Sequence, residues 1–430
     1  MRKFFRNVVW LALLVALGYL GWQTAELRRE NRKLWETVTL LEKERGDLRQ
    51  QLGANRRAPK PEEQADQRRQ IEQQTSELRG LRFRQPVTYK MIERRQLREM
   101  LERKVREQYS EQEVRDYGRS LAALGLIPEG IDLMSVWLSL YDEQVGGFYV
   151  PEEHAMYTFN DLVLTGGLDK MLLSHELTHV LQDQQFDLTK LPLNIKDNDD
   201  LALASSALIE GDATVVMTRF YAENANPGSV LGDLTAMLRQ NTTKLREAPP
   251  FLRDMLLFPY QQGQQFVNAL MAAGGNESVD AAFRRPPTST AEILHPDRFL
   301  ARGEAAPAVT LPRISSKDWR LIGNNVLGEF GIQELLQASL GVVEAQLAAQ
   351  GWTADRYQVY ERGPKGPTGL VWRSSWNRES DAREFEEAYG LLARKRSLAA
   401  RVHRQGTIVT IQQSSDPAFL ELSAAALGFN

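Results

Sequence analysis

A histidine–glutamate pair followed by a second histidine stands near the middle of the chain. His175, Glu176 and His179 form the pattern HExxH within the run KMLLSHELTHVLQDQQFD. Residues four apart lie on one face of a helix, so the two imidazoles can bind a single metal ion. A zinc ion held in this way lowers the pKa of a bound water towards ~7. Glu176, one position round the turn, can take the proton as the hydroxide attacks a carbonyl, which predicts a hydrolytic centre.

The residues around this motif are apolar on one side of the helix. Leu173, Leu177, Val180 and Leu181 form a stripe that predicts burial in a core, with the polar face turned towards the proposed ion. The alternative interpretation is a surface helix on which two histidines fall four residues apart by chance. The chain contains only 5 histidines in 430 residues, which makes such a coincidence uncommon.

Two histidines and a water leave a catalytic zinc one protein ligand short. Downstream, the run NDDLALASSALIEGDATVVMTRFYAEN predicts a long helix, capped by Asn198 or Asp199. This run carries Glu210 among small and apolar residues, where a carboxylate is costly to bury unless it is paired or bound to metal. Glu210 is therefore the predicted third ligand, and an ion pair with Arg219 or a lysine is the alternative.

Two aspartates compete for a place at the same centre. Asp212 and Asp183 are rival carboxylate ligands. Asp183 lies four residues after His179 on the same helix face. That spacing also suits an outer partner that accepts a hydrogen bond from a histidine N–H.

These segments together resemble the gluzincins, the HExxH metallopeptidases with a glutamate as third zinc ligand. HELTHVLQDQ and ALIEGDA carry the resemblance, which is closest to bacterial peptidase-MA-like proteins. PYQQGQQFVNALMAAGG (residues 259–275) is similar to their Y-x-x-G-x-x-F segment, and PPTSTAEILHP (residues 286–296) to a segment of uncharacterised members. The resemblance covers roughly residues 130–300. It implies a zincin-like fold, a Zn2+ cofactor held by His175, His179 and Glu210, and a peptide or protein substrate.

The chain departs from the family pattern at one position. Many gluzincins place an aspartate four residues after the ligand glutamate to orient the first histidine, and here that position is Thr214. The outer partners must therefore come from elsewhere, with Asp212 and Asp183 as candidates.

The transition state of hydrolysis carries an oxyanion, which needs a hydrogen-bond donor besides the metal. Tyr260 and His295 are the two candidates for this role. Tyr260 opens the Y-x-x-G-x-x-F segment, and His295 follows an Ile-Leu pair and precedes Pro296. A core tyrosine and a structural, hydrogen-bonded histidine are the alternatives.

Residues 146–159 contain two β-rich runs, GGFYV and AMYTF, separated by PEEH. This pattern predicts a hairpin, with His154 exposed in its turn rather than bound to metal. The resemblance implies that one strand of the hairpin forms an edge over the zinc, where an extended substrate can pair with it.

The N-terminal region predicts attachment to a membrane. Arg2, Lys3 and Arg6 precede a 15-residue apolar run, and no convincing cleavage site follows. We expect an uncleaved anchor in residues 1–23, with the catalytic part extracytoplasmic; a cleaved signal and a secreted protein are the alternative. Leucines recur every seven residues from Leu27 to Leu48, which predicts a coiled coil that joins two copies or a partner, or else a lone stalk helix. Prolines break this helix, and a second polar helix is expected to about Leu81, with a solvated surface.

The predicted fold class is α+β: a mainly helical zincin-like domain with an anchor and a stalk, followed by a small C-terminal α+β unit. The expected domains are the anchor (1–23), a coiled-coil stalk (24–84), the metallopeptidase domain (85–300) and the C-terminal unit (301–430). Trp352, Trp372 and Trp376 are expected in the core of that last unit. The expected helices are residues 91–109, 111–124, 132–141, 231–246, 250–257, 381–394 and 418–427, and the expected C-terminal strands are RYQVY, GLVWRSSW and GTIVTIQ.

Composition narrows the function further. A net charge of −3 gives no reason to expect nucleic-acid binding, and the lack of cysteine excludes disulfides and thiolate metal sites. The sequence thus favours a membrane-anchored zinc metallopeptidase. A zinc-binding but non-catalytic envelope scaffold, acting through the coiled coil and the C-terminal unit, is the alternative from another class, and a hydrolase of non-peptide amides is a third.

Overall fold

The computed structural model describes residues 61–142, 147–159, 164, 167–224, 243–301 and 308–429. The predicted anchor and heptad helix lie outside the described residues, as does most of the expected helix 231–246. The chain divides into two units, residues 1–63 and 64–430. The second unit carries every predicted site residue and is the one described below.

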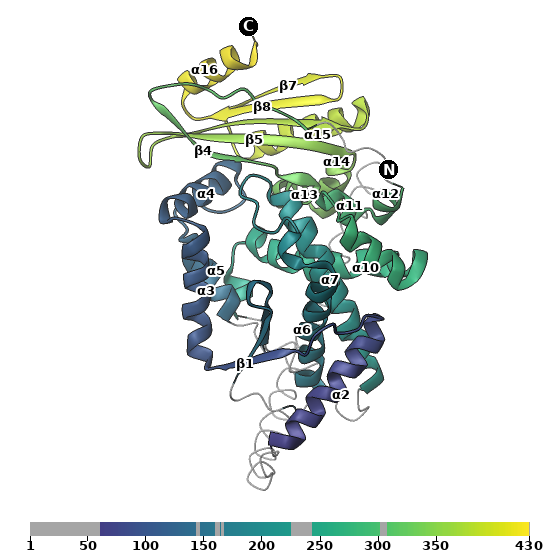
Figure 1. Cartoon of the computed structure of the whole chain (residues 1–430). Coiled ribbons are helices and arrows are strands. Elements are labelled where there is room, and N and C mark those ends of the chain that lie inside the picture. Colours follow the sequence, from purple (N-terminus) through teal and green to yellow (C-terminus); the bar gives the residue numbers. More distant parts are fainter. Residues whose placement is uncertain are drawn as a thin grey trace, which may run out of the picture. The chain divides into compact units, whose positions relative to one another are not determined.

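The central helices of this unit are α6, α7 and α10, which pack against one another (Figure 1). Helix α7 bears Glu210 and is buried along most of its length; Asn198 Oδ1 accepts a hydrogen bond from the Leu201 N–H at its start, as a cap does. It is the one described helix long and apolar enough to cross a membrane, but 61% of its apolar window is buried within the protein, which marks it as a core helix. The helices up to residue 301 are α2 (Pro61–Arg79), α3 (Arg94–Gln108), α4 (Glu111–Leu124), α5 (Leu133–Asp142), α6 (Gly167–Phe186), α7 (Asp199–Asn224), α9 (Thr243–Glu247), α10 (Pro250–Arg284), α11 (Thr290–Leu294) and α12 (Pro296–Leu300).

Two glycines let the backbones of α7 and α10 touch. A Cβ on Gly211 would overlap the backbone of Gly263, and a Cβ on Gly263 would overlap the carbonyl oxygen of Ala207. Gly211 directly follows Glu210, and Gly263 lies one turn after Tyr260. The two motifs that resemble the peptidase family therefore meet at a single helix crossing, which fixes Glu210 and Tyr260 relative to each other.

A small sheet lies beside α6. Its strands are β1 (Thr88–Ile92), β2 (Gly147–Val150) and β3 (Ala155–Phe159), in the order β1-β3-β2. The predicted hairpin is confirmed: β2 and β3 are antiparallel, and β2 is an edge strand. Strand β1 stands where the helix expected from Met91 would begin. It leaves no hairpin pattern in the sequence because it pairs in parallel with the distant β3.

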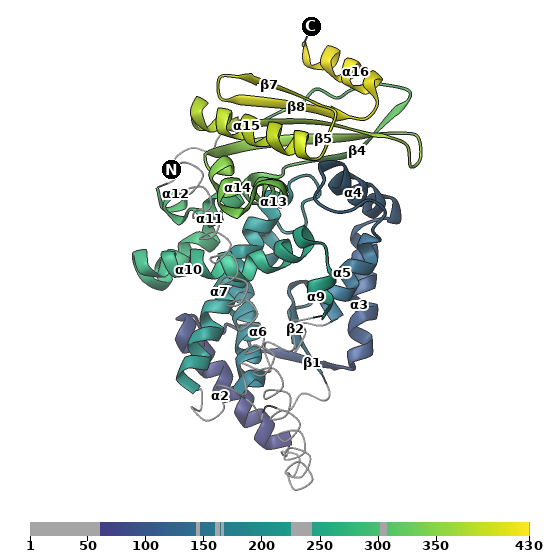
Figure 2. The same cartoon turned by 180° about the vertical axis from the view of Figure 1, so that it is seen from behind.

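The C-terminal unit is a five-stranded antiparallel sheet in the order β4-β5-β6-β8-β7, covered by helices (Figure 2). The three predicted strands and both predicted helices are confirmed, and the three tryptophans are buried in the core. The missed strands, β4 and β7, are the two edges of the sheet and carry polar residues, so they lack the apolar pattern of a buried strand. The elements are β4 (Trp319–Asn325), α13 (Gly328–Leu340), α14 (Val342–Ala349), β5 (Trp352–Arg362), β6 (Thr368–Trp376), α15 (Glu379–Lys395), β7 (Ala400–Gln405), β8 (Ile408–Ser414) and α16 (Pro417–Leu427).

Helix α2 differs from the solvated stalk helix that was expected. Ile71 packs with residues of α6, and the hydroxyl of Thr75 donates to Ser174 Oγ, 3.1 Å away. Arg79 is only 1% exposed and pairs with two aspartates. The second half of the polar helix is thus part of the compact unit, which begins at Gln64 rather than at residue 85.

We predict that Gly263→Ala destabilises the protein. The added methyl has no space at the contact between α7 and α10, and overpacking of this kind costs about 1–3 kcal/mol. Gly390→Ala is the matched control: this glycine lies inside α15, the nearest atom to its Cβ would be Arg394 Nη1 at 3.5 Å, and alanine is the better helix former. Thermal unfolding should show a lower Tm for Gly263→Ala and an equal or higher Tm for Gly390→Ala. Equal Tm values for Gly263→Ala and the unsubstituted chain would contradict the close contact.

Candidate metal centre

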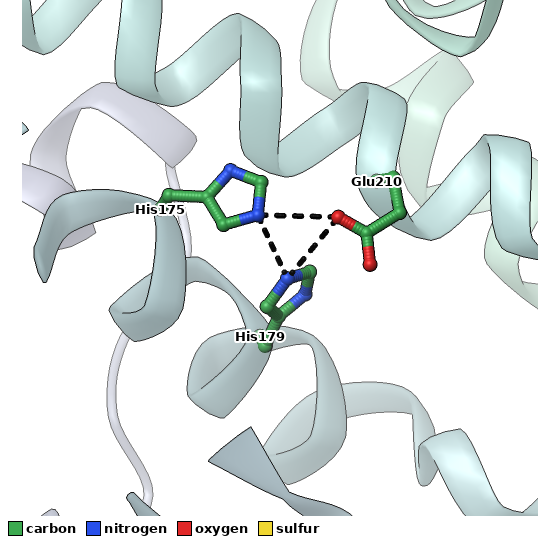
Figure 3. A group of neighbouring side chains, drawn as sticks. All are labelled: His175, His179 and Glu210. Carbon is green, nitrogen blue, oxygen red and sulfur yellow. Dashed lines mark hydrogen bonds and ion pairs between the residues drawn. The ribbon is translucent and has the colours of Figure 1, made fainter. Parts of the chain in front are cut away.

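Helices α6 and α7 bring three nitrogen and oxygen ligands to one point. His175 Nε2 lies 3.1 Å from His179 Nε2 and 3.1 Å from Glu210 Oε2, and His179 Nε2 lies 3.6 Å from the same oxygen. Figure 3 shows the two imidazoles on α6 and the carboxylate on α7 turned towards one another. Three residues predicted to act together from sequence therefore form one cluster, the only such group among the described residues.

The dimensions of this triangle fit a metal ion. Ligands about 2.0–2.1 Å from a tetrahedral ion are separated by about 3.3 Å, which is the edge of the coordination tetrahedron. The three observed separations lie on either side of that value. Two imidazoles and one carboxylate suit a borderline divalent cation, and three protein ligands leave a fourth position open. The cluster could therefore hold a catalytic metal ion.

The ligands are partly shielded from solvent. Both histidines are less than 9% exposed, and the Glu210 side chain is 22% exposed. Burial disfavours charge on His179, but the carboxylate of Glu210 outweighs it and raises the pKa of His179 to about 9. Burial also disfavours charge on Glu210, and the two imidazoles overcome it and hold the pKa of Glu210 well below its usual range. The site thus stabilises a negative charge on Glu210 and a positive charge next to it, either on a protonated histidine or on a metal ion.

The outer partner of His179 is Gln182, not either predicted aspartate. His179 Nδ1 lies 2.9 Å from Gln182 Oε1. An amide oxygen only accepts, so Nδ1 carries a proton, and it is Nε2 that must lose its proton before its lone pair can face an ion at the centre. The Gln182 amide then donates to the backbone oxygen of Ile209 (3.0 Å) and to Asp212 (2.9 Å).

Asp212 extends this chain of hydrogen bonds to α2 and the far part of α10. Arg79 Nε donates to Asp212 Oδ2 over 2.8 Å, and Arg79 Nη2 donates to Asp280 Oδ1 over 2.8 Å. Asp212 therefore supports the centre through Gln182 and does not touch either histidine. Because Arg79 and Asp212 are both buried, this ion pair is costly to break from one side.

Asp183 belongs to the hairpin instead. It accepts from the hydroxyl of Tyr149 (2.7 Å) and the backbone N–H of Leu188 (3.0 Å), and lies 2.8 Å from His154 Nδ1. His154 stands in the turn between β2 and β3 with a positive φ of 47°. Its side chain is 74% exposed, as predicted, and it is not a member of the candidate cluster formed by His175, His179 and Glu210. Asp183 thus ties the hairpin to α6 rather than orienting His179.

The position that departs from the gluzincin pattern has a visible consequence. Nδ1 of His175 is buried with no hydrogen-bond partner among the described residues. Thr214 Oγ1, on the residue that replaces the usual aspartate, is likewise buried without a partner. Within the described residues, no side chain holds Nδ1 of His175 in the way that Gln182 holds Nδ1 of His179.

Glu176 lies beside the ligands but points to the edge strand. Its Oε2 accepts the backbone N–H of Tyr149 on β2, over 3.2 Å. Burial, together with the charge of Glu210, raises the pKa of Glu176, against the opposing effect of the two histidines. A carboxylate whose basicity is raised in this way is suited to accepting a proton.

The two predicted oxyanion donors lie in different places. Tyr260 is next to the centre: its ring stacks on His175 with centroids 6.2 Å apart. His295 Nε2 instead lies 2.6 Å from Glu329 Oε1 on α13, and Glu329 also pairs with Arg298. His295 therefore links α11 and α12 to the C-terminal unit, which is the structural alternative considered for it.

The sequence analysis did not find Gln182, Tyr149 and Arg79. Gln182 follows His179 by three residues, which places it on the same helix face, and its amide could have been weighed beside Asp183. Tyr149 acts through its backbone, and Arg79 reaches the site from a separate helix. Neither leaves a local signal in the sequence.

Comparison with known proteins gives little further guidance. Residues 319–423, from β4 into α16, match a family described as a domain of unknown function (DUF8575). No curated protein matches the chain. A solved structure from Chloroflexus aurantiacus, described as a candidate hydrolase with a novel fold, is 20% identical, covers 57% of this chain and 92% of its own, and has a TM-score of 0.33. At that TM-score the likeness carries no argument about fold or activity.

We predict that Gln182→Met weakens metal binding by about 10–100-fold, the usual effect of losing an outer partner of a histidine ligand. Methionine is close in size but cannot accept the N–H of His179. Gln185→Met is the control, because Gln185 lies on the same helix and bonds only to the backbone oxygen of Arg82. Competition with a chromophoric chelator, using Zn2+ as the probe ion, measures both affinities. Equal affinities for the two variants would show that Gln182 does not support the centre.

The raised pKa of His179 predicts that metal affinity depends on pH. The metal-free protein holds a proton on His179 up to a pKa of about 9, and that proton must leave before the ion binds. Affinity for Zn2+ should therefore rise by up to about tenfold per pH unit between pH 6.5 and 8.5. Calorimetric titrations in buffers of different ionisation enthalpy should report about one proton released per ion at pH 7.5. An affinity that stays constant over this range, with no proton released, would contradict the pairing of His179 with Glu210.

Proposed function

We propose that this chain is a zinc-dependent metallopeptidase of the gluzincin type. The observation that carries the proposal is the triangle of His175, His179 and Glu210, whose separations suit one tetrahedral ion. Two histidines and a glutamate form a donor set used by catalytic zinc sites with one open position. The HExxH motif adds a carboxylate beside that position, which a purely structural zinc site does not need.

Zinc bound at this site would acidify a water in the open position and polarise the carbonyl of a substrate. Glu176 then acts as general base, taking the proton of the water, and afterwards as general acid, delivering it to the leaving amine. The Tyr149 N–H donates a hydrogen bond to Glu176 Oε2. The other carboxylate oxygen, Oε1, is then the one that accepts and returns the proton. The raised pKa of Glu176 suits both directions of transfer.

Tyr260 is the proposed oxyanion donor. Its ring lies beside that of His175, with the centroids 6.2 Å apart, which places the Tyr260 side chain next to the candidate centre. The helix crossing at Gly211 and Gly263 supports this role because it prevents Tyr260 from moving relative to Glu210. The pairing of His295 with buried Glu329 favours a structural role for that histidine.

The proposed substrate is a peptide or protein that lies along β2. This strand is an edge. The Tyr149 N–H points to Glu176 rather than to β3, so the alternate residues Tyr149 and Gly147 direct their backbone groups towards the side on which Glu176 lies. An extended peptide could add to this edge. Residues 1–23 are proposed to anchor the enzyme in the cell membrane with the catalytic unit extracytoplasmic, and residues 24–52 to form a coiled coil with a second copy or another partner.

We expect Glu176→Gln to lower kcat/KM by about 10²–10⁴-fold because it removes the general base. Tyr260→Phe should lower kcat by about 10²-fold or more because it removes an oxyanion donor. Hydrolysis of a quenched fluorescent peptide library and elemental analysis of the purified protein measure turnover and zinc content. Both variants should retain one zinc per chain.

Glu111→Gln is the control for the first of these variants, since Glu111 is exposed on α4. It should cleave the library as the unsubstituted chain does. Stoichiometric zinc without any cleavage by the unsubstituted chain would favour the non-catalytic scaffold. Absence of bound zinc after dialysis against Zn2+ would remove the basis of the proposal.

A further inference from the structure

A cavity lies away from the candidate metal centre, where α4, α5 and the start of α7 meet β4 and β5. Its volume is about 250 Å³. Asp199 on its wall precedes Glu210 by eleven residues of the same helix, which corresponds to about 17 Å. The cavity is therefore separate from the metal centre. It is lined by Tyr109, Tyr117, Trp137, Asp199, Asn325 and Tyr357, with Lys196 among the remaining lining residues.

The walls of this cavity are rich in aromatic rings. The rings of Tyr117 and Trp137 lie with centroids 6.0 Å apart, tilted by 35°. The faces of such rings attract cations. One such cation–π contact is present in the cavity wall, where Lys196 Nζ lies 4.9 Å from the centre of the Tyr109 ring. Lys196 is held there by Glu113, over 2.7 Å, and its side chain is 51% exposed.

The charges of the cavity do not balance. Glu113 is paired with Lys196, and Asp116 is paired with Arg320. Asp199 accepts a hydrogen bond from the hydroxyl of Tyr117 over 2.9 Å, but it forms no ion pair in the described part of the chain. Burial raises the pKa of this carboxyl to about 6, which reflects the cost of keeping its charge without a counter-ion.

A second polar group in the cavity lacks a partner. Tyr357 is 1% exposed, and its hydroxyl makes no hydrogen bond within the described residues. This hydroxyl is not among the fully enclosed polar atoms that lack a partner, so it faces the space of the cavity, where a ligand can reach it. Tyr357 and Asp199 line the same small space, so one ligand could satisfy both.

We propose that this cavity binds a primary ammonium group carried on a short aliphatic stem. The ammonium donates hydrogen bonds to the carboxylate of Asp199 and to the hydroxyl oxygen of Tyr357. The stem lies against the rings of Tyr117 and Trp137. The volume fits a small amine or one amino-acid side chain rather than a drug-sized molecule. The ligand is thus either a free alkylamine or the lysine side chain of a peptide.

Fluorine NMR of the full chain labelled with 5-fluorotryptophan tests the proposal, because Trp137 reports from inside the cavity. Its resonance is assigned through Trp137→Phe. n-Butylamine should shift this resonance in a saturable manner, and 1-butanol, which lacks the charge, should bind at least about tenfold more weakly. Nα-acetyl-lysine amide distinguishes the two sources: binding equal to that of butylamine indicates a peptide side chain, and much weaker binding indicates a free amine.

Two variants identify the binding groups. Asp199→Asn should weaken butylamine binding by about tenfold or more, whereas Asp318→Asn, at an exposed position outside the cavity lining, should leave it unchanged. Tyr357→Phe should weaken binding several-fold with no loss of Tm, because the hydroxyl has no partner inside the protein. The proposal fails if butylamine does not shift the Trp137 resonance, if butanol binds as well as the amine, or if Asp199→Asn binds with unchanged affinity.

Discussion

The structure of this unit depends on the close approach of three polar atoms. His175 Nε2, His179 Nε2 and Glu210 Oε2 lie within 3.6 Å of one another on two buried helices. Two imidazole nitrogens do not approach each other this closely without a proton or a cation between them. The carboxylate of Glu210 adds a charge that must be balanced in a space with little water. These polar groups would be better solvated in water, so the surrounding fold must hold them together. The helix contacts and hydrogen bonds described above do this.

Two kinds of contact provide that support. Steric contact fixes the backbones: α7 and α10 touch through glycines, so Glu210 and Tyr260 have little freedom to move apart. Directional hydrogen bonds fix the side chains: Gln182 sets the tautomer of His179, and Asp212 and Arg79 hold Gln182. The two histidines differ, since Nδ1 of His175 has no such partner in the described part of the chain. The ring of His179 is therefore the more firmly oriented of the two.

The parts of this site that the sequence predicted are those whose chemistry lies within one segment. The HExxH spacing places two ligands on one helix face, and a glutamate in an otherwise apolar helix stands out as costly to bury. Asp212 and Asp183 were the predicted outer partners, Asp183 because it lies four residues after His179 on the same helix face, but the Gln182 side chain reaches His179 from one position earlier. Arg79 lies in a segment of polar residues, which predicts a solvated helix. Its burial depends on ion pairs with Asp212 and Asp280, which are more than 130 residues away in the sequence. Strands β1, β4 and β7 were missed for a related reason, since each is an edge or pairs with a distant strand.

The burial of Arg79 determines where this protein can be shortened. Residues before Gln64 form a separate unit, so a chain that starts near that point keeps the whole of the compact part. A chain that starts after Arg79 leaves Asp212 inside the protein with no counter-ion, at a cost on the order of 3–5 kcal/mol. The hydrogen bonds to Gln182 would weaken with it. Helix α2 is therefore an integral part of the unit that holds the candidate metal centre, and removing it would disturb that centre.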